Sequence, residues 1–460
     1  MENSQAVVGL GYVGLSVAEA ASAVGGDVVG IDVEPGKVAS LNEGRSPVDV
    51  LADDDLALML DRGFRATTDA AVLASCDTVV ICVPTPLDAD RRPDLSLVRT
   101  AAETVARHLR PGTLVVVEST IWPGATEDVV LPLLEHGSGL TAGADFHLAY
   151  SPERVDCGNP EFDIRNTPKV VAGHTQACAD RAAAFYGKFI GEIVPVAGIR
   201  EAELCKLLEN TYRSVNIALV NEMAVFCDEL GIDLWESIRA AATKPFGFER
   251  FLPGPGVGGH CIPVDPLYLT HAVRALGRPF RLVELAVEVN EAMPEHVFSR
   301  VQRQLNGEGK CLQGADVLVV GVTYKPDVAD LRESPATPLV RSLRRAGARV
   351  TFADPLVEEW SVDAGPGTPT EPGRPTPPLD NTPGHTPAAA QPPLPPKPGG
   401  PRRPGPASSK QPLREPGALA RTTTAGGRRS GPGPTPAAPG PAGAAKTTAR
   451  GHRTAPGTLG

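Results

Sequence analysis

The sequence predicts an α/β fold over its first 360 residues, followed by a proline-rich tail. Short apolar runs alternate with amphipathic or alanine-rich stretches along this part of the chain. The runs occupy residues 6–8, 28–31, 78–83 and 114–117, and the helical stretches between them include 15–24, 52–62 and 95–108. Strand–helix alternation of this kind is typical of a parallel sheet with helices on both faces.

One long helix is expected over residues 201–230, before Gly231, a natural C-terminal stop. At about 1.5 Å per residue it would be roughly 45 Å long, enough to join two domains and to offer a dimer surface. Seven apolar residues recur in it at helical spacing: Leu204, Leu207, Leu208, Val215, Leu219, Met223 and Phe226. A second strand–helix–strand unit then follows, with strands at 316–321 and 349–352 around a helix near 335–346.

The tail differs sharply in composition. Residues 361–460 contain 24 of the 47 prolines and no Cys, Phe, Trp, Tyr, Ile or Met. Such a segment cannot bury enough apolar surface to offset the entropy of ordering, so we predict a disordered tail over 359–460. Pro392–Lys397 resembles a polyproline II ligand of SH3 domains, although plain low complexity is the favoured interpretation.

Charge and cysteine content exclude several classes of protein. The net charge is -10, and because the tail has 12 basic and 4 acidic residues, the first 360 residues carry -18. This balance argues against nucleic acid as a partner, and no stretch approaches the roughly 20 apolar residues of a membrane span. The N-terminus lacks the pattern of a signal peptide. The eight cysteines include no CxxC pair, which favours free thiols in a reducing cytoplasm over disulfides or a metal site.

A GxGxxG motif lies between the first strand and the first helix, formed by Gly9, Gly11, Tyr12, Val13 and Gly14. Its glycines allow a tight turn, and the helix N-terminus can face a pyrophosphate. Asp32 ends the second strand, 18 residues after Gly14. A carboxylate at this position can accept hydrogen bonds from the ribose hydroxyls of NAD and would repel the 2′-phosphate of NADP. We therefore predict a Rossmann-like domain over residues 1–198 that binds NAD; the alternative is a glycine-rich structural turn.

A rigid, glycine- and proline-rich loop over residues 253–266 contains Cys261 and, four residues later, Asp265. The preceding Gly258 and Gly259 would let a ligand approach closely. A lone cysteine is usually a small buried hydrophobe, whereas a neighbouring lysine would favour the reactive thiolate.

Polar residues on the long helix offer a partner for this loop. Glu203, Lys206 and Asn210 have i, i+3, i+7 spacing and share one helix face. A site and a solvated surface stripe explain this spacing equally well. Glu153, in a turn-rich segment after a strand, offers a carboxylate that could position a water.

Together these motifs resemble the UDP-glucose/UDP-N-acetylhexosamine 6-dehydrogenase family from Gly9 to about Leu356. The matching segments are GLGYVG, VPTP at 83–86, EST at 118–120, SPER at 151–154, EAELCKLLENTYR at 201–213, GPGVGGHCIPVDP at 254–266 and GVTYKPDVADLRESP at 321–335. The resemblance implies a four-electron oxidation of a sugar C6 alcohol to a carboxylate with two NAD. A cysteine is needed because its thiohemiacetal with the aldehyde can donate the second hydride.

The resemblance also implies roles for individual residues. The catalytic set would be Cys261 as nucleophile, Lys206 and Asn210 as oxyanion stabilisers, Asp265 and Thr120 as holders of the base water, and Glu153 as helper of thioester hydrolysis. The NAD contacts would be Gly9, Gly11, Tyr12, Val13, Gly14, Asp32, Lys37, Thr85, Thr120 and Arg332. The substrate contacts would be Glu153, Lys206, Asn210, Gly258 and, at the UDP, Lys325. No metal is expected.

Within the family, the forms SPERVD and PGPGVGGHCIPVDP resemble the N-acetylhexosamine branch, which predicts UDP-GlcNAc or UDP-ManNAc as substrate. The expected partner is a second copy of the chain, bound through helix 201–230. The resemblance further implies a central helical domain at 199–305 and a UDP-binding Rossmann-like domain that is incomplete, at 310–358. An incomplete sheet would expose strand edges and apolar faces.

Three other functions stay open at this point. A UDP-glucose 6-dehydrogenase would perform the same chemistry on another sugar. A hydroxyacid-type NAD dehydrogenase would transfer two electrons only, although the GGHC loop is foreign to that type. An inactive NAD-binding protein would follow from the incomplete UDP domain.

Overall fold

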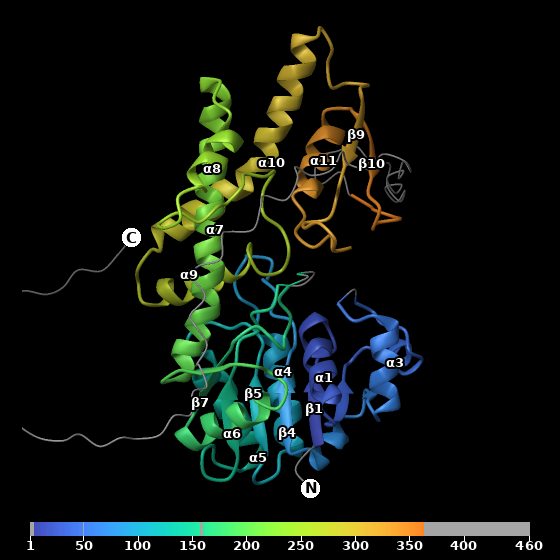
Figure 1. The fold of residues 1–460 in the computed structure, drawn as a ribbon, viewed down its shortest axis with the longest axis vertical. Coiled ribbons are helices and arrows are strands. Elements are labelled where there is room, and N and C mark those ends of the chain that lie inside the picture. Colours follow the sequence, from blue (N-terminus) through green and yellow to red (C-terminus); the bar gives the residue numbers. More distant parts are fainter. Residues whose placement is uncertain (1–3, 49, 157–158, 160, 363–460) are drawn as a thin grey trace, which may run out of the picture. The chain divides into compact units, whose positions relative to one another are not determined.

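The computed structural model describes residues 4–48, 50–156, 159 and 161–362 (Figure 1). An eight-stranded sheet forms the N-terminal part, in the order β3-β2-β1-β4-β5-β6-β7-β8. Every pair in it is parallel except β6–β7. Its strands are β1 (Ser4–Val8), β2 (Asp27–Ile31), β3 (Arg65–Thr67), β4 (Thr78–Ile81), β5 (Leu114–Val117), β6 (His147–Tyr150), β7 (Lys169–Gly173) and β8 (Ile193–Pro195). The predicted α/β class is confirmed.

Helices cover both faces of this sheet because its central strands are apolar on both sides. Val115 and Val117 of β5 pack into one core with α4 and α5, whereas Leu114 and Val116 pack into the other with α1 and α6. The helices of this part are α1 (Tyr12–Ala23), α2 (Pro35–Asn42), α3 (Asp53–Asp61), α4 (Ser96–His108), α5 (Leu131–Ser138) and α6 (Gln176–Tyr186), with a 3-10 turn at Ala70–Ser75 and a π-helical turn at Thr126–Val130.

The predicted long helix is α7 (Ile199–Leu230), which ends at Gly231 in a left-handed conformation. Its polar face, with Glu203, Lys206 and Asn210, is the buried one. This burial decides against a solvated stripe. Several of its large apolar residues are exposed instead: Leu204, Leu208, Leu219 and Phe226, together with Tyr212 and Leu230.

Three more helices complete the central part: α8 (Leu234–Ala241), α9 (Asp265–Ala275) and α10 (Arg281–Gly307). Helix α10 packs along α7, and a polar contact joins the two, with Asn221 Nδ2 donating to Asn290 Oδ1 over 2.9 Å. No helix among the described residues is long and apolar enough to cross a membrane.

The C-terminal unit contains the predicted strand–helix–strand: β9 (Asp316–Val320), α11 (Ala336–Arg345) and β10 (Arg349–Ala353), with the strands parallel. Within the described residues β9 pairs only with β10, and Val320 is 44% exposed. Trp360 and Val362, which the sequence assigns to the tail, are buried in the core of this unit. The packed part therefore extends beyond 358. The other predictions for the tail concern residues outside those described.

Candidate functional site

The GxGxxG turn is shaped by close backbone packing. Gly9 has φ +96°, and a β-carbon on it would lie 2.7 Å from the Cys82 carbonyl oxygen. A β-carbon on Gly14 would lie 1.9 Å from the Gly9 carbonyl oxygen. The space beside Gly11 is open, at the point where α1 begins with Tyr12. A pyrophosphate can therefore approach the backbone at Gly11 and the free N–H groups of the helix N-terminus.

Asp32 lies directly after β2 and is buried. Its Oδ2 accepts hydrogen bonds from the Leu10 backbone N–H at 2.9 Å and from Lys37 Nζ at 3.0 Å. Burial alone would raise the pKa of Asp32, but these donors and the Glu34 N–H outweigh it and the pKa is lowered. The carboxylate is thus ionised beside the glycine turn, as an acceptor for ribose hydroxyls must be.

The other predicted cofactor residues gather at the same edge. Thr85 and Thr120 follow β4 and β5, and parallel strands end at a common edge of the sheet. Thr85 is buried and bonds Tyr268 of α9, whose hydroxyl also donates to the Pro86 carbonyl over 3.2 Å. The Arg332 guanidinium lies 5.2 Å from the centre of the Tyr12 ring and is also paired with Asp330. Arg332 and the start of α1 are therefore neighbours, although 320 residues separate them.

The cysteine loop ends at α9. Cys261 is exposed, and its carbonyl accepts a hydrogen bond from the Asp265 N–H at 2.8 Å. Asp265 is fully buried at the start of α9, and Asn210 Nδ2 of α7 donates to its Oδ2 over 2.5 Å. Burial raises the pKa of Asp265 to about 6. A carboxyl group with such a pKa can exchange a proton near neutral pH.

Lys206 is buried among the acidic groups of the site. Burial alone would lower its pKa. Nearby negative charge outweighs this effect, with Cys261 and Asp265 the largest contributors and Glu153 next, so the pKa is raised. Lys206 is therefore a fixed cation beside Cys261, which favours the thiolate and can stabilise an oxyanion.

Glu153 lies beyond β6, buried near Lys206 and Lys169. Its Oε1 accepts a hydrogen bond from the Val155 N–H. Its Oε2 is buried and has no hydrogen-bond partner among the described residues. A buried carboxylate oxygen without a hydrogen bond is costly, so a water or a substrate group is expected there.

The glycines before Cys261 pack closely against another part of the chain. A β-carbon on Gly258 would lie 2.7 Å from the Glu333 carbonyl oxygen, and one on Gly259 would lie 2.7 Å from the Tyr324 ring. The Gly259 N–H also donates to the Arg332 carbonyl at 2.9 Å. The close approach at these glycines is therefore made by the segment between β9 and α11, and a substrate contact at Gly258 stays a prediction.

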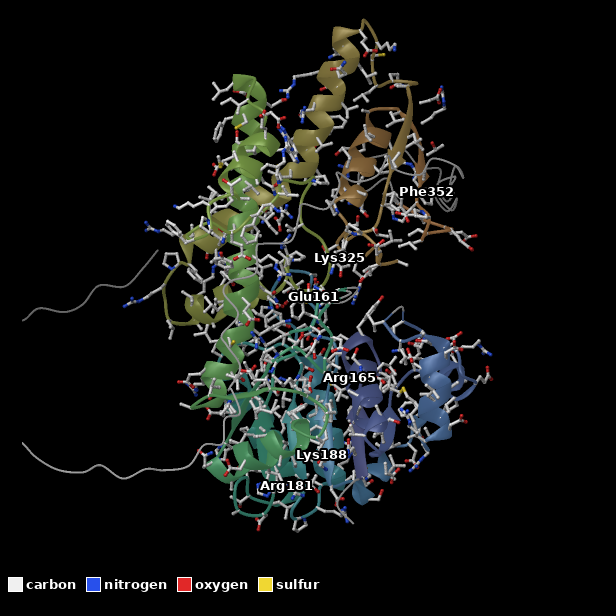
Figure 2. The ribbon with its side chains drawn as sticks, viewed as in Figure 1. Glu161, Arg165, Arg181, Lys188, Lys325 and Phe352 are labelled. Atoms are coloured by element: carbon white, nitrogen blue, oxygen red, sulfur yellow. The ribbon has the colours of Figure 1, made fainter. Side chains whose placement is uncertain are left out.

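Lys325 (labelled in Figure 2) comes from that same segment. It forms a 2.5 Å ion pair with Asp156, which follows the SPER motif. Both side chains are partly exposed. The cation is therefore accessible to a phosphate group that exchanges with Asp156.

The sequence motifs did not predict the partners of two buried acidic residues, Glu203 and Glu118. Glu203 shares the α7 face of Lys206 but binds the Thr126 N–H at 2.8 Å and the Gly124 N–H, and burial raises its pKa to about 7. It therefore fastens the turn before Thr126–Val130 to α7. The second residue, Glu118, forms a buried pair with Lys169. An acidic or basic residue inside an apolar strand pattern is the only sequence signal for such a pair. Within the described residues no group of three metal-binding side chains occurs.

Comparison with known proteins gives three matches along the chain. The models are those of the UDP-glucose/GDP-mannose dehydrogenase family: the NAD binding domain matches residues 4–190, the central domain 200–292 and the UDP binding domain 318–371. The predicted resemblance and the NAD cofactor are thereby confirmed.

Individual relatives match over most of their length. The UDP-N-acetyl-D-glucosamine 6-dehydrogenase of Pseudomonas aeruginosa is 36% identical over 354 residues, which are 76% of this chain and 82% of that protein. The UDP-N-acetyl-D-mannosamine dehydrogenase of Salmonella typhi is 38% identical over 354 residues, 74% of this chain and 82% of that one. The structure of a UDP-D-ManNAc dehydrogenase from Pyrococcus horikoshii aligns with TM-score 0.72 at 35% identity and covers 77% of this chain and 84% of that one.

Proposed function

Because this chain belongs to the UDP-glucose/GDP-mannose dehydrogenase family, an NAD-dependent group of nucleotide-sugar oxidoreductases, we propose that it oxidises the C6 hydroxyl of a UDP-N-acetylhexosamine to the uronate. The observation that carries the proposal is the position of Lys206, buried beside Cys261, Asp265 and Glu153. The relatives named for UDP-N-acetylglucosamine and UDP-N-acetylmannosamine support the choice of sugar.

NAD, when bound, accepts one hydride in each of two oxidation steps. Gly11 and the start of α1 would hold its pyrophosphate, and Asp32 its ribose hydroxyls. Lys37 orients Asp32, while Thr85, Thr120 and Arg332 line the same edge of the sheet. Gly9 and Gly14 permit the turn itself, and Tyr12 and Val13 open α1.

In the first oxidation a water held by Asp265 and Thr120 takes the proton of the C6 hydroxyl. Asn210 orients Asp265 through its 2.5 Å hydrogen bond. The water passes this proton to Asp265, and Lys206, kept cationic by its surroundings, stabilises the C6 alkoxide until the hydride leaves and the aldehyde forms. Asn210 assists it, and together they hold the sugar at the reacting carbon.

In the second oxidation the Cys261 thiolate attacks the aldehyde carbon, giving a thiohemiacetal whose C–H bond can supply the second hydride. The product is a thioester on Cys261. Water, activated by Glu153, then adds to the thioester carbon and the Cys261 thiolate leaves, which releases the uronate. The aldehyde stays attached between the two steps.

Two binding roles complete the proposal. Lys325 would bind the UDP, and the backbone at Gly258 would line the sugar site. The exposed apolar residues of α7, among them Leu204, Leu208 and Leu219, support a homodimer formed through this helix. The seven described cysteines are all free, which supports a reducing compartment such as the cytoplasm.

A mass-spectrometric assay with several UDP-sugars tests the proposal, run beside Cys261→Ser. We expect two NADH for each uronate formed, and turnover of an acetamido sugar at a higher kcat/KM than UDP-glucose. The variant should lose uronate formation but still bind NAD. Undiminished uronate formation by Cys261→Ser would contradict the role of the cysteine, and one NADH per product would favour a two-electron dehydrogenase.

A second candidate function follows from the C-terminal unit. The described sheet of this unit has two strands and leaves Val320 exposed. The alternative function is therefore that of a protein that binds NAD but does not oxidise a UDP-sugar. Calorimetry with UDP separates the two. Tight UDP binding by the full chain supports the enzyme, and its absence supports the alternative.

A further inference from the structure

A buried ion cluster lies beneath the catalytic site. Lys169 opens β7 and is 4% exposed, and Glu118, directly after β5, is 2% exposed. Lys169 Nζ donates to Glu118 Oε2 over 2.9 Å and to the Pro152 carbonyl oxygen over 3.3 Å. The Tyr186 hydroxyl donates to the other oxygen of Glu118.

The same ammonium group faces Glu153. Lys169 Nζ lies 3.6 Å from Glu153 Oε2, the buried oxygen that accepts no hydrogen bond from the part of the chain that the structure describes. An ammonium has three N–H groups. Two of them are used by Glu118 and Pro152, which leaves the third for Glu153 or for a water between the two groups.

We propose that Lys169 is a positioning residue for thioester hydrolysis: it fixes the oxygen of Glu153 that accepts the proton of water. This inference rests on the proposed function, since Glu153 acts there on the thioester. In that step the water oxygen bonds to the thioester carbon and one water proton passes to Glu153 Oε2. The C–S bond breaks, its electron pair stays on Cys261, and no electron acceptor is needed.

Hydrogen-bond geometry gives the physical reason. A carboxylate oxygen that faces a fixed ammonium group keeps one direction, and a base must be aimed at the water whose proton it accepts. The opposing charges of Glu118 and Glu153 also outweigh the burial of Lys169 and raise its pKa, so the cation is permanent.

Other ionisable groups around Glu153 do not replace this cation. Those that interact with it or with Lys169 come from five elements: Glu118, Tyr186, Lys206, Arg154 and Cys82. Lys206 interacts more strongly with Cys261 and Asp265 than with Glu153, and Arg154 is paired with Glu209 at 2.6 Å. Lys169 is therefore the cation held at the free oxygen of Glu153.

The test uses the full-length chain and Lys169→Met. We expect both hydride transfers to keep their rates, while hydrolysis slows about tenfold. Rapid mixing with NADH fluorescence follows the hydride transfers. Intact-protein mass spectrometry follows the sugar thioester on Cys261, which should accumulate in the variant. KM for the UDP-sugar should stay unchanged.

A paired variant separates positioning from folding. Lys169→Met leaves Glu118 buried without its cation, which destabilises the protein. Lys169→Met combined with Glu118→Gln removes both charges and should restore the unfolding temperature, yet hydrolysis should stay slow. Wild-type hydrolysis in this double variant would overturn the proposal and leave Lys169 as a structural partner of Glu118.

Lys188→Met is the matched control. Lys188 (labelled in Figure 2) lines a small pocket with Ser4 and Thr78, at the amino-terminal ends of β1 and β4. It should leave the thioester lifetime unchanged, and a longer lifetime in this variant would count against a specific role for Lys169. A wild-type chain that forms no uronate would overturn the proposed function itself, and the inference with it.

Discussion

The two sheets of the chain are built from similar sequence patterns but differ in burial. Strand β5 reads LVVV and all four of its residues are fully buried, because strands flank it on both sides and helices cover both faces. Strand β9 reads DVLVV, yet its residues are only partly buried or exposed. The same apolar run therefore becomes a core strand or a half-covered strand according to what packs on it. We therefore expect the NAD-binding sheet to be the more stable part of the molecule, called the robust part below, and the C-terminal unit to be the marginal part.

The largest expected effect comes from truncating one core phenylalanine in each part. Phe146 and Phe352 are both almost fully buried, and Phe→Ala in a core costs about 3–5 kcal/mol. Phe352→Ala should unfold the C-terminal unit while NAD affinity falls less than about tenfold. Phe146→Ala should lower the unfolding temperature of the sheet together with NAD binding. Hydrogen exchange measures the unfolding of each part in the two variants, and titration with NAD measures their affinity for the cofactor.

The outcome for Phe352→Ala decides whether the two parts are independent. Complete loss of NAD binding in this variant would show that the C-terminal unit supports the cofactor site, for example through the contact of Arg332 with Tyr12. The contrast between a robust and a marginal part would then be wrong.

A smaller effect is expected at Asp265, where burial raises the pKa to about 6. Because the carboxylate is the form that accepts a proton, kcat/KM should rise with pH through about 6. Asp265→Asn should lose activity about 10²-fold and lose this pH dependence. Profiles of kcat/KM against pH for the wild type and the variant measure this dependence. If kcat/KM of the variant still rises through about pH 6, the titrating group is not Asp265.

The stability of Asp265→Asn gives an independent check. The raised pKa means that the folded state binds this proton more tightly than the unfolded state. The group therefore favours folding below its ordinary pKa of 3.8, and this contribution is lost as pH rises through about 6. At neutral pH the variant should be at least as stable as the wild type, measured by urea unfolding. Less activity with equal or greater stability would mark a residue kept for function.

Much of this contrast could be predicted from residue patterns. The apolar runs gave the strands, and the GxGxxG turn with Asp32 gave the cofactor edge, because both signals are local. Lys206 and Cys261 were predicted through motifs, but spacing could not decide whether the polar face of α7 is buried. Only the fold places Glu118 and Lys169 together, since 51 residues separate them. The close packing of Gly258 against the Glu333 backbone likewise depends on a contact between segments that are distant in the sequence.

Asp32 offers a finer comparison within the robust part. Asp32→Asn should weaken NAD binding about tenfold, because the neutral amide is a poorer acceptor for ribose hydroxyls. The hydrogen bonds that lower the pKa of Asp32 also stabilise the fold above its ordinary pKa of 3.8, and this contribution is lost as pH falls through the lowered value. The matched control is Asp27→Asn, at the exposed start of β2. Fluorescence titration with NAD measures both, and equal weakening in both variants would contradict the specific role.

The smallest change in free energy is expected at Val320, 44% exposed at the end of β9. Val320→Lys should alter the free energy of unfolding by only about 0.5 kcal/mol, because an exposed side chain loses little burial. It should nevertheless raise solubility, since a charge on an open strand opposes edge-to-edge pairing. Val116→Lys, at a fully buried position of β5, is the opposite case and should prevent stable folding. If Val320→Lys instead destabilises the protein by several kcal/mol, Val320 is covered in solution, for example by a second copy of the chain, and the two sheets are more alike than their described strands indicate.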